Sequence, residues 1–196
     1  MKKIIPHLIT FSRLILAPLF LVLLLFANSN PKSDEFTILS LWLCYFLIEI
    51  SDLIDGFLAR QLQCVTEFGK IFDPFADSLS RLTAFLGFML IGQMPVWVFV
   101  VILYRDLTIS FLRTILAKQG FVQAARLTGK IKAWIYALTN IVALVAFSAK
   151  RVLILLPFFD MLYVLNLVFF ISAAVIAIIS GLDYFKFFIN KKTKAT

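Results

Sequence analysis

Residues 160–182 decide the fold class, and they read DMLYVLNLVFFISAAVIAIISGL. From Met161 to Leu182 this stretch has no charged side chain, and a helix that crosses a bilayer needs about 20 mostly apolar residues. Five earlier stretches have a similar length, at residues 8–27, 36–60, 70–92, 95–117 and 131–149. Because the apolar runs are continuous rather than alternating, they predict helices and not barrel strands. We therefore expect an all-α integral membrane protein with six transmembrane helices.

The composition supports this class. Of the 196 residues, 62% are apolar and 15% are charged, and the mean hydropathy is +0.98. A soluble domain has about half its residues apolar and about a quarter charged, so soluble globular, disordered and collagen-like proteins are excluded. No internal repeat or separate soluble segment is visible, so we expect residues 1–196 to form a single transmembrane domain.

The charges along these stretches predict orientation. The first, fifth and sixth stretches are the cleaner apolar spans, with one charged residue each, whereas the second, third and fourth carry three or four. Lys and Arg gather on the cytoplasmic side of membrane proteins. With six spans and a cytoplasmic amino terminus, that side holds all but three of the 19 basic residues, the exceptions being Lys32, Lys150 and Arg151. We expect a multi-pass membrane protein with both termini in the cytoplasm.

A cleaved signal peptide is the alternative interpretation of the amino terminus. Pro6, Arg13 and Pro18 interrupt its apolar stretch and no persuasive cleavage site follows, so a first transmembrane helix is favoured. The two cysteines, Cys44 and Cys64, lack the spacing of a zinc site or a disulfide framework.

Residues 51–81 hold the candidate site, and they read SDLIDGFLARQLQCVTEFGKIFDPFADSLSR. Asp52 and Asp55 are three residues apart, and Asp73 and Asp77 are four apart. These spacings place each pair on one face of its helix. The short connection predicts that the two helices are antiparallel neighbours, so that the four carboxylates converge near the cytoplasmic side.

Four converging carboxylates need compensating positive charge. Hard oxygen ligands suit Mg²⁺ or Mn²⁺, and two such ions would leave positions for a pyrophosphate. Gly56 would allow a phosphate to approach the helix closely, and Arg60 would pair with it one turn further on. The pattern therefore predicts two divalent ions and a pyrophosphate-containing substrate.

The same residues resemble the signature of the CDP-alcohol phosphatidyltransferases, D-x2-D-G-x2-A-R-x8-G-x3-D-x3-D. All fixed positions match, at Asp52, Asp55, Gly56, Ala59, Arg60, Gly69, Asp73 and Asp77. The resemblance implies that the four aspartates hold metal and that Asp77 is also the general base. It implies that the acceptor hydroxyl attacks the β-phosphorus of a CDP-linked lipid and that CMP leaves. The family's six-helix architecture agrees with the spans, and its tendency to dimerise implies a homodimer.

Two further segments are similar to the phosphatidylglycerophosphate synthases within this family. Residues 104–134 resemble that group's pattern R-D/E-x-x-I-x-x-L-R followed by G-K-x-K, and residues 5–14, IPHLITFSRL, resemble P-N-x-L-T-x-x-R. A phosphorylated acceptor would need cations on the cytoplasmic side, with Arg as a bidentate clamp and Lys as a point charge. The expected acceptor-phosphate residues are Arg105, Arg113, Lys130 and Lys132, and the expected CDP-lipid residues are Thr10, Gly56, Ala59, Arg60 and Gly69.

The resemblance implies phospholipid biosynthesis, with transfer of a phosphatidyl group from CDP-diacylglycerol to glycerol 3-phosphate. It also implies a location in the bacterial inner membrane, with the active site facing the cytoplasm. Three positions depart from the group's pattern: His7 replaces Asn, Ser78 replaces Lys and Ala133 replaces Thr. Inositol phosphate, or phosphatidylglycerol as in cardiolipin synthases, therefore stays open as the acceptor.

Two other classes fit the sequence less well. An intramembrane prenyltransferase needs a second Asp-rich motif, and the later spans hold only the isolated Asp160 and Asp183. A small transporter or channel would distribute its polar groups across the membrane depth, whereas here they cluster near the cytoplasmic side. We attribute the net charge of +8 to basic residues that set the orientation in the membrane and form a pocket for an anionic substrate. We do not interpret it as a surface for nucleic acid.

Overall fold

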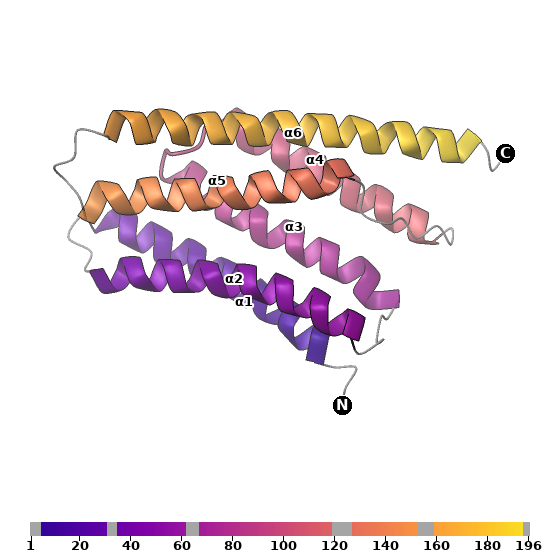
Figure 1. Ribbon diagram of the computed structural model, residues 1–196, viewed down its shortest axis with the longest axis horizontal. Helices are drawn as coiled ribbons and strands as arrows, with labels where there is room; N and C mark the ends of the chain where they lie inside the picture. Colours follow the sequence, from indigo (N-terminus) through magenta and orange to yellow (C-terminus); the bar gives the residue numbers. More distant parts are fainter. Residues whose placement is uncertain (1–4, 31–34, 62–66, 119–126, 153–158, 194–196) are drawn as a thin grey trace. The chain divides into compact units, whose positions relative to one another are not determined.

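The computed structural model describes the backbone of residues 5–30, 35–61, 67–118, 127–152 and 159–193, and the side chains of residues 10–30, 35–51, 54, 72–116, 127–151 and 160–189. In these ranges the backbone forms six helices and no strand (Figure 1). They are α1 (Ile5–Ser29), α2 (Glu35–Gln61), α3 (Glu67–Leu90), α4 (Val96–Lys118), α5 (Leu127–Val152) and α6 (Phe159–Thr193). The all-α fold class is confirmed.

Three helices are long and apolar enough to cross a membrane. Their apolar segments are Thr10–Ser29, Leu127–Arg151 and Asp160–Ile189, in a search confined to the described residues. These are the same three spans that the sequence predicts to be the cleaner ones, while the four signature aspartates lie on α2 and α3. The three helices indicate an association with the membrane, and the six crossings stay a prediction.

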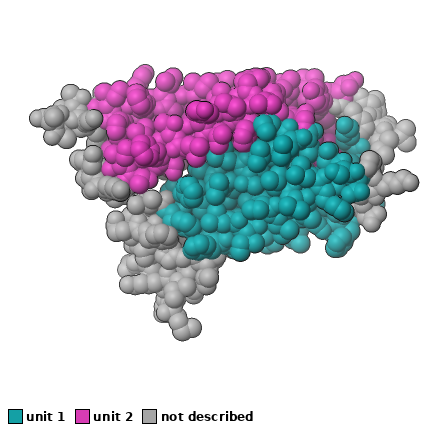
Figure 2. Space-filling model, turned by 180° about the vertical axis from the view of Figure 1, so that it is seen from behind, with its two compact units in different colours: residues 1–91, 148–154 teal, residues 92–147, 155–196 magenta. Residues whose placement is uncertain are grey.

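The chain divides into two compact units, coloured separately in Figure 2. Unit 1 comprises residues 1–91 and 148–154, and unit 2 comprises residues 92–147 and 155–196. The expectation of one transmembrane domain over residues 1–196 stays a prediction.

In unit 1, α1 packs against both α2 and α3. The Phe20 ring of α1 is fully buried, with its centroid 6.2 Å from the ring of Tyr45 on α2 and 6.2 Å from that of Phe88 on α3. A Cβ atom on Gly87 would lie 2.9 Å from Leu24 Cδ2, so the missing side chain lets α3 approach α1 closely. This packing fixes the register of α1 against α3, on which the site in unit 1 depends.

The carboxyl end of α1 is capped from elsewhere in unit 1. The Arg151 guanidinium donates hydrogen bonds to the carbonyl oxygens of Ala27 and Asn30. The last carbonyl groups of a helix lack amide donors within the helix, and a cation there also interacts favourably with the helix dipole.

In unit 2, α4 packs against α6. Helix α6 carries small buried side chains at Ala173, Ala174 and Ala177, and small side chains permit close approach of neighbouring helices. Nearer the carboxyl end, Tyr184 joins Ile109, Leu112 and Leu116 of α4 in a buried cluster, against which Phe187 and Phe188 pack.

This cluster explains why α6 extends beyond its predicted transmembrane span. The last apolar span is predicted to end at residue 182, whereas α6 continues to Thr193. Helix α6 has 35 residues, which at about 1.5 Å per residue give a length of about 50 Å. Because the hydrocarbon core of a bilayer is only about 30 Å thick, α6 is longer than a membrane crossing requires. The aromatic residues that follow the span stay helical because they pack on α4.

Candidate active site

Two of the signature aspartates lie one turn apart on α3. Asp73 and Asp77 are both partly buried, and their spacing of four places them on the same face. Pro74 follows Asp73 inside the helix. Because proline has no N–H group, it cannot donate to the carbonyl four residues earlier.

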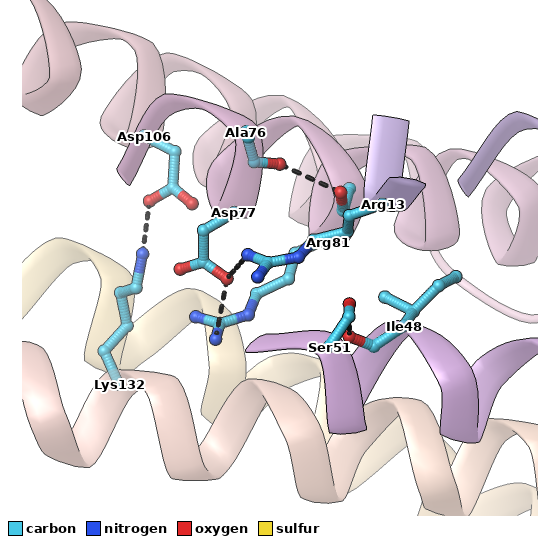
Figure 3. Close-up of polar contacts among 9 residues, drawn as sticks. Arg13, Ile48, Ser51, Ala76, Asp77, Arg81, Asp106 and Lys132 are labelled. Atoms are coloured by element: carbon cyan, nitrogen blue, oxygen red, sulfur yellow. Dashed lines mark hydrogen bonds and ion pairs between the residues drawn. The ribbon is translucent and has the colours of Figure 1, made fainter. Parts of the chain in front are cut away.

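Asp77 is held by two guanidinium groups (Figure 3). Its Oδ1 atom lies 3.0 Å from Arg81 Nη2, one turn along α3, and 3.5 Å from Arg13 Nη1 of α1. Arg13 is 1% exposed, and Asp77 is 28% exposed. A buried cation aimed at a partly exposed carboxylate fixes the position of that carboxylate while leaving it within reach of a substrate.

Asp73 is held from α1 as well. Thr10 Oγ1 donates a hydrogen bond of 3.1 Å to Asp73 Oδ1, and Thr10 is buried. Next to this bond, the Phe11 and Phe72 rings lie 5.0 Å apart. Thr10 and Arg13 are three residues apart on α1, so one face of α1 meets the two carboxylates of α3. The sequence assigns Thr10 to the CDP-lipid, and the structure adds a contact with a predicted metal ligand.

The other signature residues lie outside the described side chains. The backbone is helical at Asp52, Asp55, Gly56, Ala59 and Arg60 in α2 and at Gly69 in α3. The described part of the chain contains no group of three or more candidate metal ligands, and only two of the four aspartates belong to that part. The convergence of all four therefore stays a prediction.

Unit 2 contains a second charged cluster, centred on a carboxylate. Asp106 Oδ1 accepts hydrogen bonds of 2.8 Å from Arg105 Nη1 and 2.7 Å from Lys132 Nζ, and Figure 3 shows the contact with Lys132. Asp106 is 2% exposed and Lys132 is 7% exposed. The Lys132 ammonium also lies 4.5 Å from the centre of the Tyr136 ring. Such burial is tolerated because the charges are paired.

The structure thus brings two of the four predicted acceptor-phosphate cations together, Arg105 and Lys132. The other two are exposed: Lys130 lies at the start of α5, and the guanidinium carbon of Arg113 lies 5.7 Å from the centre of the Tyr184 ring on α6. The sequence analysis does not assign Asp106 to the site. Its position next to Arg105 suggests an ion pair between sequence neighbours, and nothing in the sequence indicates that it also contacts Lys132.

The three departures from the family pattern lie in different settings. Ser78 is partly buried on α3, and Ala133 is partly buried on α5. His7 lies in α1, outside the described side chains.

The model of the CDP-alcohol phosphatidyltransferase family matches residues 3–179. The chain belongs to this family. It is similar to the CDP-diacylglycerol–glycerol-3-phosphate 3-phosphatidyltransferase of Bacillus subtilis, with 32% identity over 188 residues that cover 92% of this chain and 93% of that protein. It is 31% identical to a probable phosphatidylglycerophosphate synthase of Mycobacterium tuberculosis, over 92% of this chain and 79% of that one.

A third relative has a different name. The chain is 33% identical, over 60% of its own length and 53% of the other protein, to the CMP-forming cardiolipin synthase of Streptomyces coelicolor. The resemblance inferred from the signature is therefore confirmed: this CDP-alcohol phosphatidyltransferase is an enzyme of phospholipid biosynthesis.

Divalent metal ions are used generally in the CDP-alcohol phosphatidyltransferase family, and the described carboxylates fit such ions chemically. Asp73 and Asp77 offer hard oxygen donors on one helical face, and Thr10 and Arg13 hold these donors from the neighbouring helix. A pair of oriented, partly exposed carboxylates is a suitable half of a four-aspartate site.

Proposed function

We propose that this phosphatidyltransferase uses CDP-diacylglycerol as donor and glycerol 3-phosphate as acceptor, and that it releases phosphatidylglycerol phosphate and CMP. One observation carries the choice of acceptor. The similarity to the Bacillus subtilis protein, whose name contains both substrates, extends over nearly the whole length of both chains. The cations that converge on Asp106 support an acceptor with a phosphate group.

The donor half of the reaction is assigned to unit 1. Asp52, Asp55, Asp73 and Asp77 would hold two divalent ions, Mg²⁺ or Mn²⁺. When bound, the ions would neutralise charge on the pyrophosphate and make CMP a better leaving group. Thr10, Gly56, Ala59, Arg60 and Gly69 would contact the CDP-lipid.

Asp77 is assigned a second role as general base. It would accept the proton of the acceptor hydroxyl, whose oxygen then forms a bond to the β-phosphorus of the donor as the bond to the CMP oxygen breaks. A base must be oriented toward the proton that it takes, and the contacts with Arg13 and Arg81 provide that orientation.

The acceptor half is assigned to unit 2. Arg105 and Lys132 bring two positive charges together at Asp106, and guanidinium and ammonium groups are the side chains that bind phosphate. Arg113 and Lys130 are exposed and would add further attraction. We assign these four cations to the phosphate group of glycerol 3-phosphate.

The membrane arrangement follows the charge distribution. The chain would cross the bacterial inner membrane six times as a single domain, with its active site on the cytoplasmic side, where both substrates are met. A homodimer is expected from the resemblance to the family.

Phosphatidylglycerol is the alternative acceptor. It is favoured by the similarity to the CMP-forming cardiolipin synthase of Streptomyces coelicolor, although that similarity covers less of both chains than the similarity to the Bacillus subtilis protein.

An acceptor panel separates these functions. Purified protein in detergent micelles receives CDP-diacylglycerol with glycerol 3-phosphate, inositol phosphate, serine or phosphatidylglycerol, and CMP release is measured. We expect release above the acceptor-free control with glycerol 3-phosphate. Release with phosphatidylglycerol alone would replace the proposed acceptor by the alternative.

A further inference from the structure

Helix α6 makes two contacts near the cations at Asp106, one with the start of α5 and one with Arg105 itself, although the sequence places none of its residues in the site. The first contact is a hydrogen bond of 2.8 Å from Thr128 Oγ1, near the start of α5, to Asp183 Oδ2 of α6. Both side chains are partly buried. Asp183 is one of the two acids that look isolated in the sequence.

The bond to Asp183 fixes the rotation of α5. Thr128 and Lys132 are four residues apart in this helix, so their side chains share one face. Tying Thr128 to α6 therefore also sets the direction in which Lys132 leaves the helix, toward Asp106. The carboxylate of Asp183 near the amino end of α5 also interacts favourably with the dipole of that helix.

The second contact involves Gly181 and the other cation of the cluster. A Cβ atom on Gly181 would lie 3.2 Å from Arg105 Cγ, closer than in most real structures, so the stem of Arg105 would have to move. Glycine inside a helix costs about 1 kcal/mol relative to alanine. The close approach of the α6 backbone to Arg105 explains why glycine is suitable here.

Each cation that meets at Asp106 is thus held from α6, Arg105 along its stem and Lys132 through its helix. We propose that Gly181 and Asp183 are positioning residues that set the placement of Arg105 and Lys132 for the phosphate group of the acceptor. This inference rests on the proposed function, because it takes the two cations as the acceptor-phosphate site.

The first test compares Asp183→Ala with Asp183→Asn. The asparagine keeps an oxygen that accepts the bond from Thr128, and the alanine does not. We expect the alanine variant to raise KM for glycerol 3-phosphate about tenfold, the usual effect of losing a hydrogen bond to a charged group. The asparagine variant should stay within about twofold, and KM for CDP-diacylglycerol should be unchanged in both.

A double-mutant cycle tests whether Asp183 acts through Thr128. Thr128→Val should raise KM for glycerol 3-phosphate, and the rise in the double variant should be smaller than the product of the two single effects. Additive effects, or equal rises in KM for both substrates, would overturn the positioning role of Asp183.

Gly181→Ala tests the second contact. Alanine favours the helix, so we expect unchanged or higher thermal stability together with a KM for glycerol 3-phosphate raised about fivefold. Leu182→Ala is the control, because Leu182 lies between the two positions and is 59% exposed. An unchanged KM in Gly181→Ala, or the same rise in Leu182→Ala, would overturn the positioning role of Gly181.

The acceptor preference of the wild-type protein distinguishes a failure of this inference from a failure of the proposed function. If the wild type uses another phosphate-bearing acceptor, the proposed acceptor is wrong and the same KM ratios are measured with that acceptor. If the wild type uses only serine, the positioning of a phosphate site is overturned along with the proposed acceptor.

Discussion

At the scale of single residues, Asp77 shows how charge is arranged around the proposed base. Both guanidinium contacts are made by the same oxygen, Oδ1, with Arg81 from its own helix and Arg13 from the buried face of α1. The pair orients the carboxylate, and the charge of the carboxylate in turn stabilises Arg13, which is almost completely buried.

Asp77→Asn tests the role of this carboxylate. Asparagine has nearly the same shape but cannot take a proton, so we expect the rate of CMP release to fall by at least about a thousandfold. The matched control is Asp160→Asn, which changes an exposed acid at the start of α6 and should leave the rate within about twofold. Near-normal activity of Asp77→Asn would exclude Asp77 as general base.

Thr10→Val tests the hydrogen bond to Asp73 without changing the size of the side chain. Losing this donor should loosen Asp73 and raise KM for CDP-diacylglycerol about three- to tenfold. Thr83→Val is the control, because the Thr83 hydroxyl bonds to the carbonyl of Leu79 within its own helix. Equal behaviour of the two variants would contradict a role for Thr10 in holding Asp73.

At the residue scale, the sequence predicts which side chains share a helix face but not which side chains meet between helices. The spacing of Asp73 and Asp77 predicts that they share a face, because spacing within a helix determines direction. The same rule does not reveal that Asp106 meets Lys132, or Asp183 meets Thr128, since those contacts depend on how one helix is rotated against another.

At the scale of elements, α1 organises unit 1. It packs on α2 and α3 through an apolar face that includes Phe20 and Leu24, both fully buried. Its polar residues Thr10 and Arg13 meet the aspartates of α3. One helix therefore provides both the packing and the contacts that hold the carboxylates.

Phe20→Ala tests the packing function of α1. Removing a fully buried ring that meets Tyr45 and Phe88 should lower the free energy of unfolding by about 3–5 kcal/mol, measured by thermal unfolding in detergent micelles. Leu19→Ala, at a neighbouring position that is 47% exposed, should cost less than about 1 kcal/mol. Similar costs for both variants would contradict a core built around Phe20.

The helices themselves are largely predictable from the sequence. Continuous apolar runs of about 20 residues set five of the six helices to within a few residues, since glycine, proline and polar segments interrupt the chain between them. The sequence does not predict that α6 continues beyond its apolar span, because hydropathy reports the length of the membrane core and not the packing of Tyr184, Phe187 and Phe188 on α4.

At the scale of the whole molecule, the two units hold different parts of the proposed chemistry. Unit 1 contains the aspartates assigned to metal and donor, and unit 2 contains the cations assigned to the acceptor. The proposal therefore requires that changes in the two units affect the kinetic constants of different substrates.

Metal removal tests the role assigned to unit 1. Chelation with EDTA should abolish CMP release, because four carboxylates without divalent ions repel the pyrophosphate. Adding Mg²⁺ or Mn²⁺ in excess of the chelator should restore the rate. Undiminished release in EDTA would contradict a metal-dependent reaction.

Formation of phosphatidylglycerol phosphate by the purified protein tests the assigned function most directly. CDP-diacylglycerol, glycerol 3-phosphate and Mg²⁺ are supplied, and the lipid product and CMP are quantified together by mass spectrometry. We expect equal amounts of the two products, each dependent on the acceptor. CMP released without phosphatidylglycerol phosphate, or no CMP at all, would contradict the transfer to glycerol 3-phosphate.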